Sequence, residues 1–122
     1  MMKKEILICD DQPNIRESYK LILADDYDLV FAANGKDVLL YLQEKSPDFI
    51  IMDIKMPKMD GLTALKEIKK LHRDLPVLIV TGYHSVETAS AALQAGALDY
   101  IVKPFEPEQI IKSVTKIFGG GL

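Results

Sequence analysis

The sequence predicts an α/β fold, a doubly wound parallel sheet with helices on both faces. Short apolar runs typical of strands alternate five times with stretches of helical periodicity within 122 residues, and this alternation is the pattern of a parallel sheet. Two of the runs, 49–52 and 77–80, are apolar without a break, as expected of strands that are buried on both faces.

The N-terminal third of the chain contains the first two predicted strand–helix units. The strand 5–9 is followed by Pro13, which suits a first helical turn, and the apolar residues after it recur on one helix face. These residues are Ile15, Tyr19, Ile22 and Leu23. The strand 29–32 is the weakest, so we expect it at an edge of the sheet, and the Asn34-Gly35 turn closes it. A second helix then ends near Ser46-Pro47 and is marked by Val38, Leu39 and Leu42.

The third and fourth units follow the same plan. The strand 49–52 leads into a loop whose Pro57 and Gly61 exclude a longer strand. The third helix stops before Pro76 and carries Leu62, Leu65 and Ile68. The strand 77–80 precedes an alanine-rich helix, whose expected inner face consists of Val86, Ala89 and Leu93. Gly96 is the natural residue to end this helix, since glycine readily adopts the left-handed conformation.

The last unit begins with the strand 100–102, which leads into Lys103-Pro104. Pro107 opens a final helix, and its apolar residues are Ile110, Ile111, Val114, Ile117 and Phe118. We expect one domain over residues 4–118 and a flexible glycine-rich tail over 119–122, because consecutive glycines do not extend a helix.

Composition and charge narrow the function classes. The chain is 48% apolar and 27% charged, as in soluble globular proteins. A formal charge of −3 and a pI near 5.3 argue against nonspecific binding to nucleic acid or to an anionic membrane. Cys9 has no partner for a disulfide, which favours a reducing compartment. No stretch resembles a signal peptide or reaches the roughly 20 apolar residues of a membrane span, so we expect a cytoplasmic domain.

Polar groups follow four of the five predicted strands directly: Asp10-Asp11, Asp53, Thr81 and Lys103. In a parallel sheet these groups collect at the carboxyl edge, where open α/β sheets bind their ligands. Three carboxylates repel one another at close range, and a hard cation with a preference for oxygen, such as Mg²⁺, would resolve the conflict. Asp53, Thr81 and Lys103 then supply a carboxylate nucleophile, a hydroxyl donor and a cation suited to a phosphoryl group.

The combined motifs resemble those of the response-regulator receiver domains of bacterial two-component signalling, from about Lys4 to Phe118. The motifs are Cys9-Asp10-Asp11, the run MDIKMPKMDG from Met52 to Gly61, Thr81-Gly82 and Lys103-Pro104-Phe105. The resemblance implies a flavodoxin-like (βα)5 sheet with strand order 2-1-3-4-5. Within the family, single-domain receivers of the sporulation phosphorelay and the receivers of enhancer-binding transcriptional activators are the most similar.

The resemblance also implies a role for each site residue. Asp53 would accept the phosphoryl group. Asp10, Asp11, Asp53 and the backbone carbonyl of Lys55 would hold Mg²⁺, for which Mn²⁺ would substitute. Thr81 and Lys103 would contact the phosphoryl oxygens, and Tyr100 would swing inward as Thr81 moves. The Lys103-Pro104 bond would be cis, a form largely confined to proline.

The implied partners follow from this chemistry. A sensor histidine kinase or a histidine phosphotransfer protein would donate the phosphoryl group, and an output domain or effector protein would receive the signal. The domain would contact neither nucleic acid nor membrane directly. It would be a monomer or a phosphorylation-dependent dimer, through a face that carries Leu93, Asp99 and Lys112.

Two side chains would govern how long the phosphoryl group lasts, because hydrolysis needs a water in line with the bond to be broken. Lys55 and Tyr83 lie two positions after Asp53 and Thr81. Neither is an acid or an amide that could orient a water, so we expect slow self-dephosphorylation. Beyond this self-phosphorylation and self-dephosphorylation, no enzymatic activity is expected.

Other functions remain as alternatives. A phosphatase of the haloacid-dehalogenase type needs a second aspartate two positions after the first, where this chain has Lys55. An electron carrier would have a Ser/Thr/Gly-rich phosphate loop in place of Asp10-Asp11-Gln12-Pro13. A scaffold receiver that is not phosphorylated would be expected to have lost one of the five site residues, and none is lost. The chain could also be the N-terminal receiver of a longer transcriptional activator.

Overall fold

All five predicted strands form one parallel sheet in the order β2-β1-β3-β4-β5. The computed structural model describes residues 3–55, 59–82 and 85–119. The strands are β1 (Glu5–Cys9), β2 (Asp28–Ala32), β3 (Phe49–Met52), β4 (Val77–Thr81) and β5 (Asp99–Val102). β1 and β3 have the predicted bounds, the other three strands are one residue longer, and β2 lies at an edge as expected.

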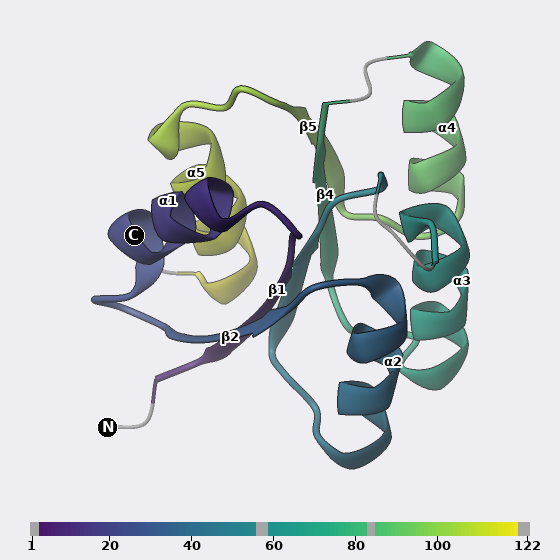
Figure 1. Cartoon of the computed structure of the whole chain (residues 1–122), viewed down its shortest axis with the longest axis horizontal. Coiled ribbons are helices and arrows are strands. Elements are labelled where there is room, and N and C mark those ends of the chain that lie inside the picture. Colours follow the sequence, from purple (N-terminus) through teal and green to yellow (C-terminus); the bar gives the residue numbers. More distant parts are fainter. Residues whose placement is uncertain (1–2, 56–58, 83–84, 120–122) are drawn as a thin grey trace.

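Within the described segments, five helices cover the two faces of the sheet. They are α1 (Pro13–Leu23), α2 (Gly35–Glu44), α3 (Gly61–Leu71), α4 (Val86–Gln94) and α5 (Pro107–Phe118). Figure 1 shows α1 and α5 on one face, and α2, α3 and α4 on the other. The described part of the chain contains no helix long and apolar enough to cross a membrane.

The strands divide their side chains between two cores, because successive residues of a strand point to opposite faces. Leu7, Ile50 and Ile79 belong to the core under α2, α3 and α4. Ile6, Ile51 and Val80 belong to the core under α1 and α5. Each of these side chains is at most 1% exposed, which accounts for the unbroken apolar runs of β3 and β4.

Side-chain caps define the starts of three helices. The side chains of Asn34, Asp60 and Ser85 accept hydrogen bonds from backbone N–H groups in the first turns of α2, α3 and α4. A capping box of Glu106 and Gln109 starts α5. The N-terminus of α1 is different, because Gln12 stands at the capping position and its side chain makes no capping bond.

The expected inner face of α4 is wrong at two of its three residues. Val86 is 82% exposed and Leu93 is 48% exposed, whereas Ala89 is half-buried and Ala92 is buried. The periodicity of this helix is ambiguous because small alanines fit either face. Ile111 of α5 is likewise 43% exposed, although Ile110 and Val114 are fully buried.

Gly61 brings the start of α3 against the backbone that follows β3. Its N–H donates a hydrogen bond to the carbonyl oxygen of Ile54 at 2.7 Å. A Cβ at this position would lie 2.5 Å from the Cα of Ile54 and 2.6 Å from the carbonyl oxygen of Asp53. These neighbours are backbone atoms, so the helix and the segment after β3 can pack this closely only with glycine here.

We therefore predict that Gly61→Ala lowers the free energy of unfolding by about 2–3 kcal/mol, since the backbone of Asp53 and Ile54 must move to admit a methyl group. Gly82→Ala is the matched control, because a Cβ at Gly82 meets nothing within 4 Å. Urea unfolding of both variants measures the difference. Equal midpoints for the two variants would contradict the close approach at Gly61.

Candidate functional site

Two buried carboxylates meet one ammonium group at the carboxyl edge of the sheet. The Nζ of Lys103 lies 2.7 Å from Oδ2 of Asp10 and 2.8 Å from Oδ2 of Asp53. Asp10 is 1% and Asp53 6% exposed. Asp10 follows β1, Asp53 follows β3 and Lys103 follows β5, so the sheet brings together residues that lie as far as 93 positions apart.

Register and alternation explain why these three side chains share one side of the sheet. Cys9 of β1 pairs with Met52 of β3, and both belong to the core under α2, α3 and α4. The next residues, Asp10 and Asp53, therefore point to the α1 and α5 side. The same alternation applies to β5, where Ile101 belongs to the core on the α1 and α5 side and Lys103 comes two residues later.

Both carboxylates are held in the same way. Oδ1 of Asp10 accepts a hydrogen bond from the backbone N–H of Gln12 at 2.9 Å, and Oδ1 of Asp53 accepts one from the N–H of Lys55 at 3.1 Å. Each bond closes a local turn two residues long, which is typical of aspartate. In both residues Oδ1 is fixed by the backbone and Oδ2 is turned toward the cation.

Thr81 and Tyr100 stand on the other side of the sheet. Thr81 ends β4 and is 0% exposed. It lies two residues after Ile79, so it faces the same side of the sheet as Ile79, which is in the core under α2, α3 and α4. Tyr100 pairs with Ile79 in β5, is half-buried, and packs against that same core. The carbonyl oxygen of Thr81 accepts a hydrogen bond from the N–H of Lys103 at 2.8 Å, which connects the two sides.

The remaining predicted site residues lie around this centre. Asp11 is exposed, so the structure brings two of the three predicted carboxylates together and leaves the third at the rim. Lys55 is exposed as well. The Lys103-Pro104 bond is cis, as predicted. Tyr83 lies outside the described residues.

Opposing influences act on the Lys103 ammonium. Burial lowers the pKa of Lys103, but the hydrogen bonds and charges of Asp10 and Asp53 outweigh it, so the pKa lies above its usual value. Nearby, burial raises the pKa of the Cys9 thiol to about 12, and the neighbouring carboxylates add to this effect. Cys9 is therefore a protonated, buried apolar residue rather than a nucleophile.

The donor atoms at this edge suit a hard divalent cation. In the described segments, no group of three or more His, Cys, Asp or Glu side chains is gathered as a metal site. Oδ2 of Asp10 and Oδ2 of Asp53 nevertheless converge on one positive charge, the Lys103 ammonium, and Asp11 follows Asp10 directly in the sequence. These donors are all oxygens, which favours Mg²⁺ over softer metals.

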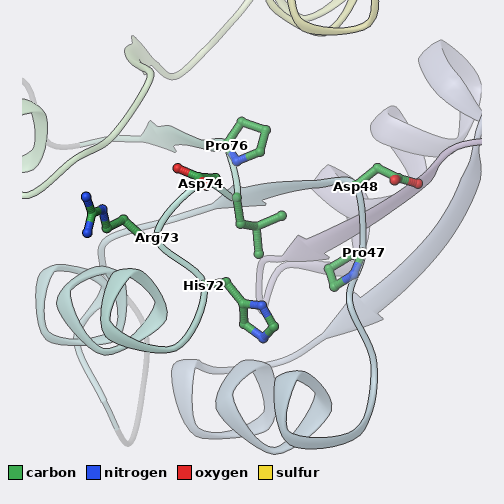
Figure 2. Close-up of a pocket in the computed structure, with 7 residues that line it drawn as sticks. Pro47, Asp48, His72, Arg73, Asp74 and Pro76 are labelled. Atoms are coloured by element: carbon green, nitrogen blue, oxygen red, sulfur yellow. The ribbon is translucent and has the colours of Figure 1, made fainter.

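A separate hollow of about 400 Å³ lies at the opposite, amino edge of the sheet. Figure 2 shows its lining, in which the Arg73 and Asp48 side chains point away from each other. Oδ2 of Asp48 accepts a hydrogen bond from the N–H of Glu5 at 2.8 Å, and the His72 ring is 3.3 Å from the carbonyl oxygen of Leu42. Asp48 and His72 thus contact backbone groups of neighbouring segments, and the hollow is remote from the paired carboxylates.

Comparison with known proteins identifies the family. The family model of the response regulator receiver domain matches residues 6–115. The chain belongs to the response-regulator receiver family. Receiver domains are phosphoryl-accepting signalling domains, and Mg²⁺ generally serves this chemistry in the family. The predicted fold, with its strand order and receiver identity, is confirmed.

Individual receivers are similar over nearly the whole chain. The chemotaxis protein CheY of Bacillus subtilis (strain 168) is 38% identical over 117 residues, which cover 94% of this chain and 98% of that protein. The crystal structure of a CheY-like receiver domain protein from Methanospirillum hungatei JF-1 has a TM-score of 0.90 and 34% identity, covering 96% of this chain and 95% of that one.

Other relatives are much longer proteins. The regulatory protein AtoC of Escherichia coli (strain K12) is 41% identical over 106 residues, which cover 86% of this receiver but 23% of AtoC. The transcriptional regulatory protein ZraR of Salmonella typhimurium is 39% identical over 115 residues, 93% of this receiver and 26% of ZraR. This receiver thus spans about a quarter of the length of these relatives.

Sequence reasoning missed two residues that shape the site. Gly61 allows α3 to start close to the backbone of Asp53. Its position as the last residue of the Met52–Gly61 motif is the one sign in the sequence that could have pointed to this role. Gln12 contacts Lys103, with Oε1 3.4 Å from Nζ. It follows Asp10-Asp11 directly, but nothing in the sequence shows that its side chain turns toward a lysine 91 positions away.

We predict that Lys103→Met lowers the free energy of unfolding in metal-free buffer by about 3–5 kcal/mol, because it leaves two buried carboxylates without a counter-charge. A raised lysine pKa stabilises the fold below the unfolded value of roughly 10.4 and loses its effect as the pH rises through the folded value. The cost of Lys103→Met should therefore be constant from about pH 6 to about pH 9 and shrink above about pH 10.

Thermal and urea unfolding in EDTA measure this cost, with the exposed Lys112→Met as the matched control. A Lys103→Met protein as stable as the Lys112→Met protein would contradict the role of Lys103 as counter-ion.

Proposed function

We propose that this receiver accepts a phosphoryl group on the carboxylate of Asp53, in a Mg²⁺-dependent reaction with a sensor histidine kinase or a histidine phosphotransfer protein. The observation that carries the proposal is the meeting of Asp10, Asp53 and Lys103 at the carboxyl edge of the sheet. In the transfer, the N–P bond of a phosphohistidine breaks and an O–P bond to Asp53 forms. Such a reaction depends mainly on positioning and on neutralising the phosphoryl oxygens.

Each residue of this chain has a defined part in the proposed reaction. The N–H of Lys55 orients the Asp53 carboxylate, and the Lys103 ammonium supplies positive charge beside it. Asp10, Asp11, Asp53 and the carbonyl of Lys55 would hold the cation. When bound, Mg²⁺ would neutralise negative charge between the carboxylates and the phosphoryl group. Thr81, at the end of the neighbouring strand, would donate its hydroxyl to a phosphoryl oxygen.

We predict one phosphoryl adduct when the protein is incubated with Mg²⁺ and acetyl phosphate, measured by intact mass. Asp53→Asn should abolish the adduct because the amide is not a nucleophile. Asp60→Asn is the matched control: it changes an aspartate that caps α3, and asparagine also caps helices well. Full labelling of the Asp53→Asn protein would refute the assignment.

The switch in this proposal connects Thr81 to Tyr100. Burial raises the pKa of Tyr100, and the charge of Asp53 adds to the effect, which supports an electrostatic coupling between these two residues. As Thr81 moves toward the phosphoryl group, Tyr100 would move inward beside it. Adding beryllofluoride should therefore change the Tyr100 ring resonances in NMR spectra. Unchanged resonances in the presence of demonstrated binding would count against the switch.

The lifetime of the phosphoryl group would depend on Lys55 and Tyr83. The Lys55 ammonium could lie across the phosphoryl oxygens and slow the approach of water. We predict that Lys55→Asn combined with Tyr83→Glu hydrolyses roughly tenfold faster, equal to about 1.4 kcal/mol of barrier, as measured by loss of the adduct mass with time. A wild-type half-life of seconds, or no acceleration in the double variant, would exclude control by these residues.

The signal would leave through the surface of α4, β5 and α5, in the cytoplasm. Large apolar side chains are exposed there, namely Val86, Leu93, Val102 and Ile111. The match with CheY covers 98% of that protein, whereas the matches cover 23% of AtoC and 26% of ZraR. The output would accordingly be either a separate partner in a phosphorelay or an attached transcriptional module. Gel filtration with and without beryllofluoride would show whether this surface pairs two receivers.

A further inference from the structure

Gln12 has a backbone that is fully engaged and a side chain that is turned toward the site. Its N–H donates to Oδ1 of Asp10 at 2.9 Å, and its carbonyl oxygen accepts from the N–H groups of Ile15 and Arg16, each at 3.1 Å. The side chain stands at the capping position of α1 but makes no capping bond. Its Oε1 instead lies 3.4 Å from Nζ of Lys103.

The carboxylate oxygens that hold Lys103 are also those that a divalent cation would need. Both Oδ2 atoms contact the ammonium at 2.7 and 2.8 Å, while both Oδ1 atoms accept backbone N–H groups. A second cation in contact with the same two oxygens would be repelled by the ammonium. Binding of a divalent ion therefore requires Lys103 to loosen its contacts with Asp10 and Asp53.

We propose that the amide oxygen of Gln12 is the acceptor that takes the Lys103 ammonium when a divalent cation binds the carboxylates. This role rests on the proposed function and makes Gln12 a positioning residue. An amide oxygen is neutral, so it can satisfy the ammonium without holding it as strongly as a carboxylate does. Lys103 then stays beside the site and remains free to turn to an incoming phosphoryl group.

The contribution of Gln12 should be larger with the cation bound than without it. In the metal-free state Lys103 has two charged acceptors at short distance, and the amide contact of 3.4 Å adds little. Once the carboxylates are engaged elsewhere, the amide becomes a principal acceptor. Removing the amide therefore costs more in the bound state, and the measurable consequence is weaker binding of Mg²⁺.

A double-mutant cycle on Mg²⁺ affinity tests the proposal, with Mg²⁺ alone as the probe and calorimetric or NMR titration as the readout. Gln12→Met keeps the length of the side chain and removes its oxygen, and we expect a threefold to tenfold higher Kd. In a Lys103→Met background the same change should leave the Kd unaltered, because no ammonium needs a new acceptor. Lys103→Gln provides a second uncharged background, and circular dichroism verifies that each variant is folded.

The control is Asn14→Leu, which removes an exposed amide two residues further along the chain in α1 and should not change the Kd. An equal loss of affinity for Gln12→Met in all backgrounds, or no loss in the wild type, would overturn the proposal. The cycle uses no phosphoryl donor. A protein that shows the predicted coupling but takes no phosphoryl group on Asp53 would contradict the proposed function and still support the role of Gln12.

Discussion

The Lys103 ammonium lies between two carboxylates that the fold has taken almost completely out of water, and the carboxyl edge of the sheet depends on this contact. Asp10 and Asp53 stand side by side because Cys9 pairs with Met52 in the register of β1 and β3. Without a positive charge between them, the two buried carboxylates would repel each other strongly. The lysine follows the end of β5, so the ion pairs also tie the carboxyl end of this edge strand to the centre of the sheet.

The buried carboxylates and the proposed switch residues occupy opposite sides of the same sheet. The carboxylates and Lys103 point toward α1 and α5, whereas Thr81 and Tyr100 belong to the side covered by α2, α3 and α4. The two sides meet where the N–H of Lys103 donates to the carbonyl oxygen of Thr81. In the proposed function, a change of charge at Asp53 would reach Thr81 through Lys103, which contacts both residues.

The helix α4 forms part of the proposed output surface, and few buried side chains hold it on the sheet. Ala92 is its one buried residue, so little apolar burial holds it on the sheet. Its C-terminal end is shaped differently: Gly96 has a φ of +107°, and a Cβ at this position would lie 3.2–3.4 Å from the aliphatic carbons of Lys69. The Lys69 ammonium in turn donates to the carbonyl oxygen of Leu75 at 2.6 Å. The helix is thus anchored at its end and weakly held along its length.

The local sequence determined the elements of this protein and most of its strand-end chemistry. Unbroken apolar runs defined β3 and β4 to within one residue, and Pro13, Pro107 and Gly96 marked helix ends by their backbone geometry alone. The positions of Asp10, Asp53 and Lys103 after strands were also visible, because a strand end is a local property. Receiver motifs then supplied the strand order, which no pattern within a single strand contains.

Tertiary structure decided what depends on register and on distance in space. It made Ala92 rather than Val86 and Leu93 the inward residue of α4, since alanines on several sides of this helix leave its orientation to be set by packing against the sheet. It placed Asp11 in water while Asp10 was buried, because adjacent residues point in different directions. It also directs the Gln12 side chain toward Lys103 and brings Gly61 close to the backbone of Asp53. These contacts join segments far apart in the chain, and their physical cause is the packing of the folded sheet and helices, which local sequence patterns do not encode.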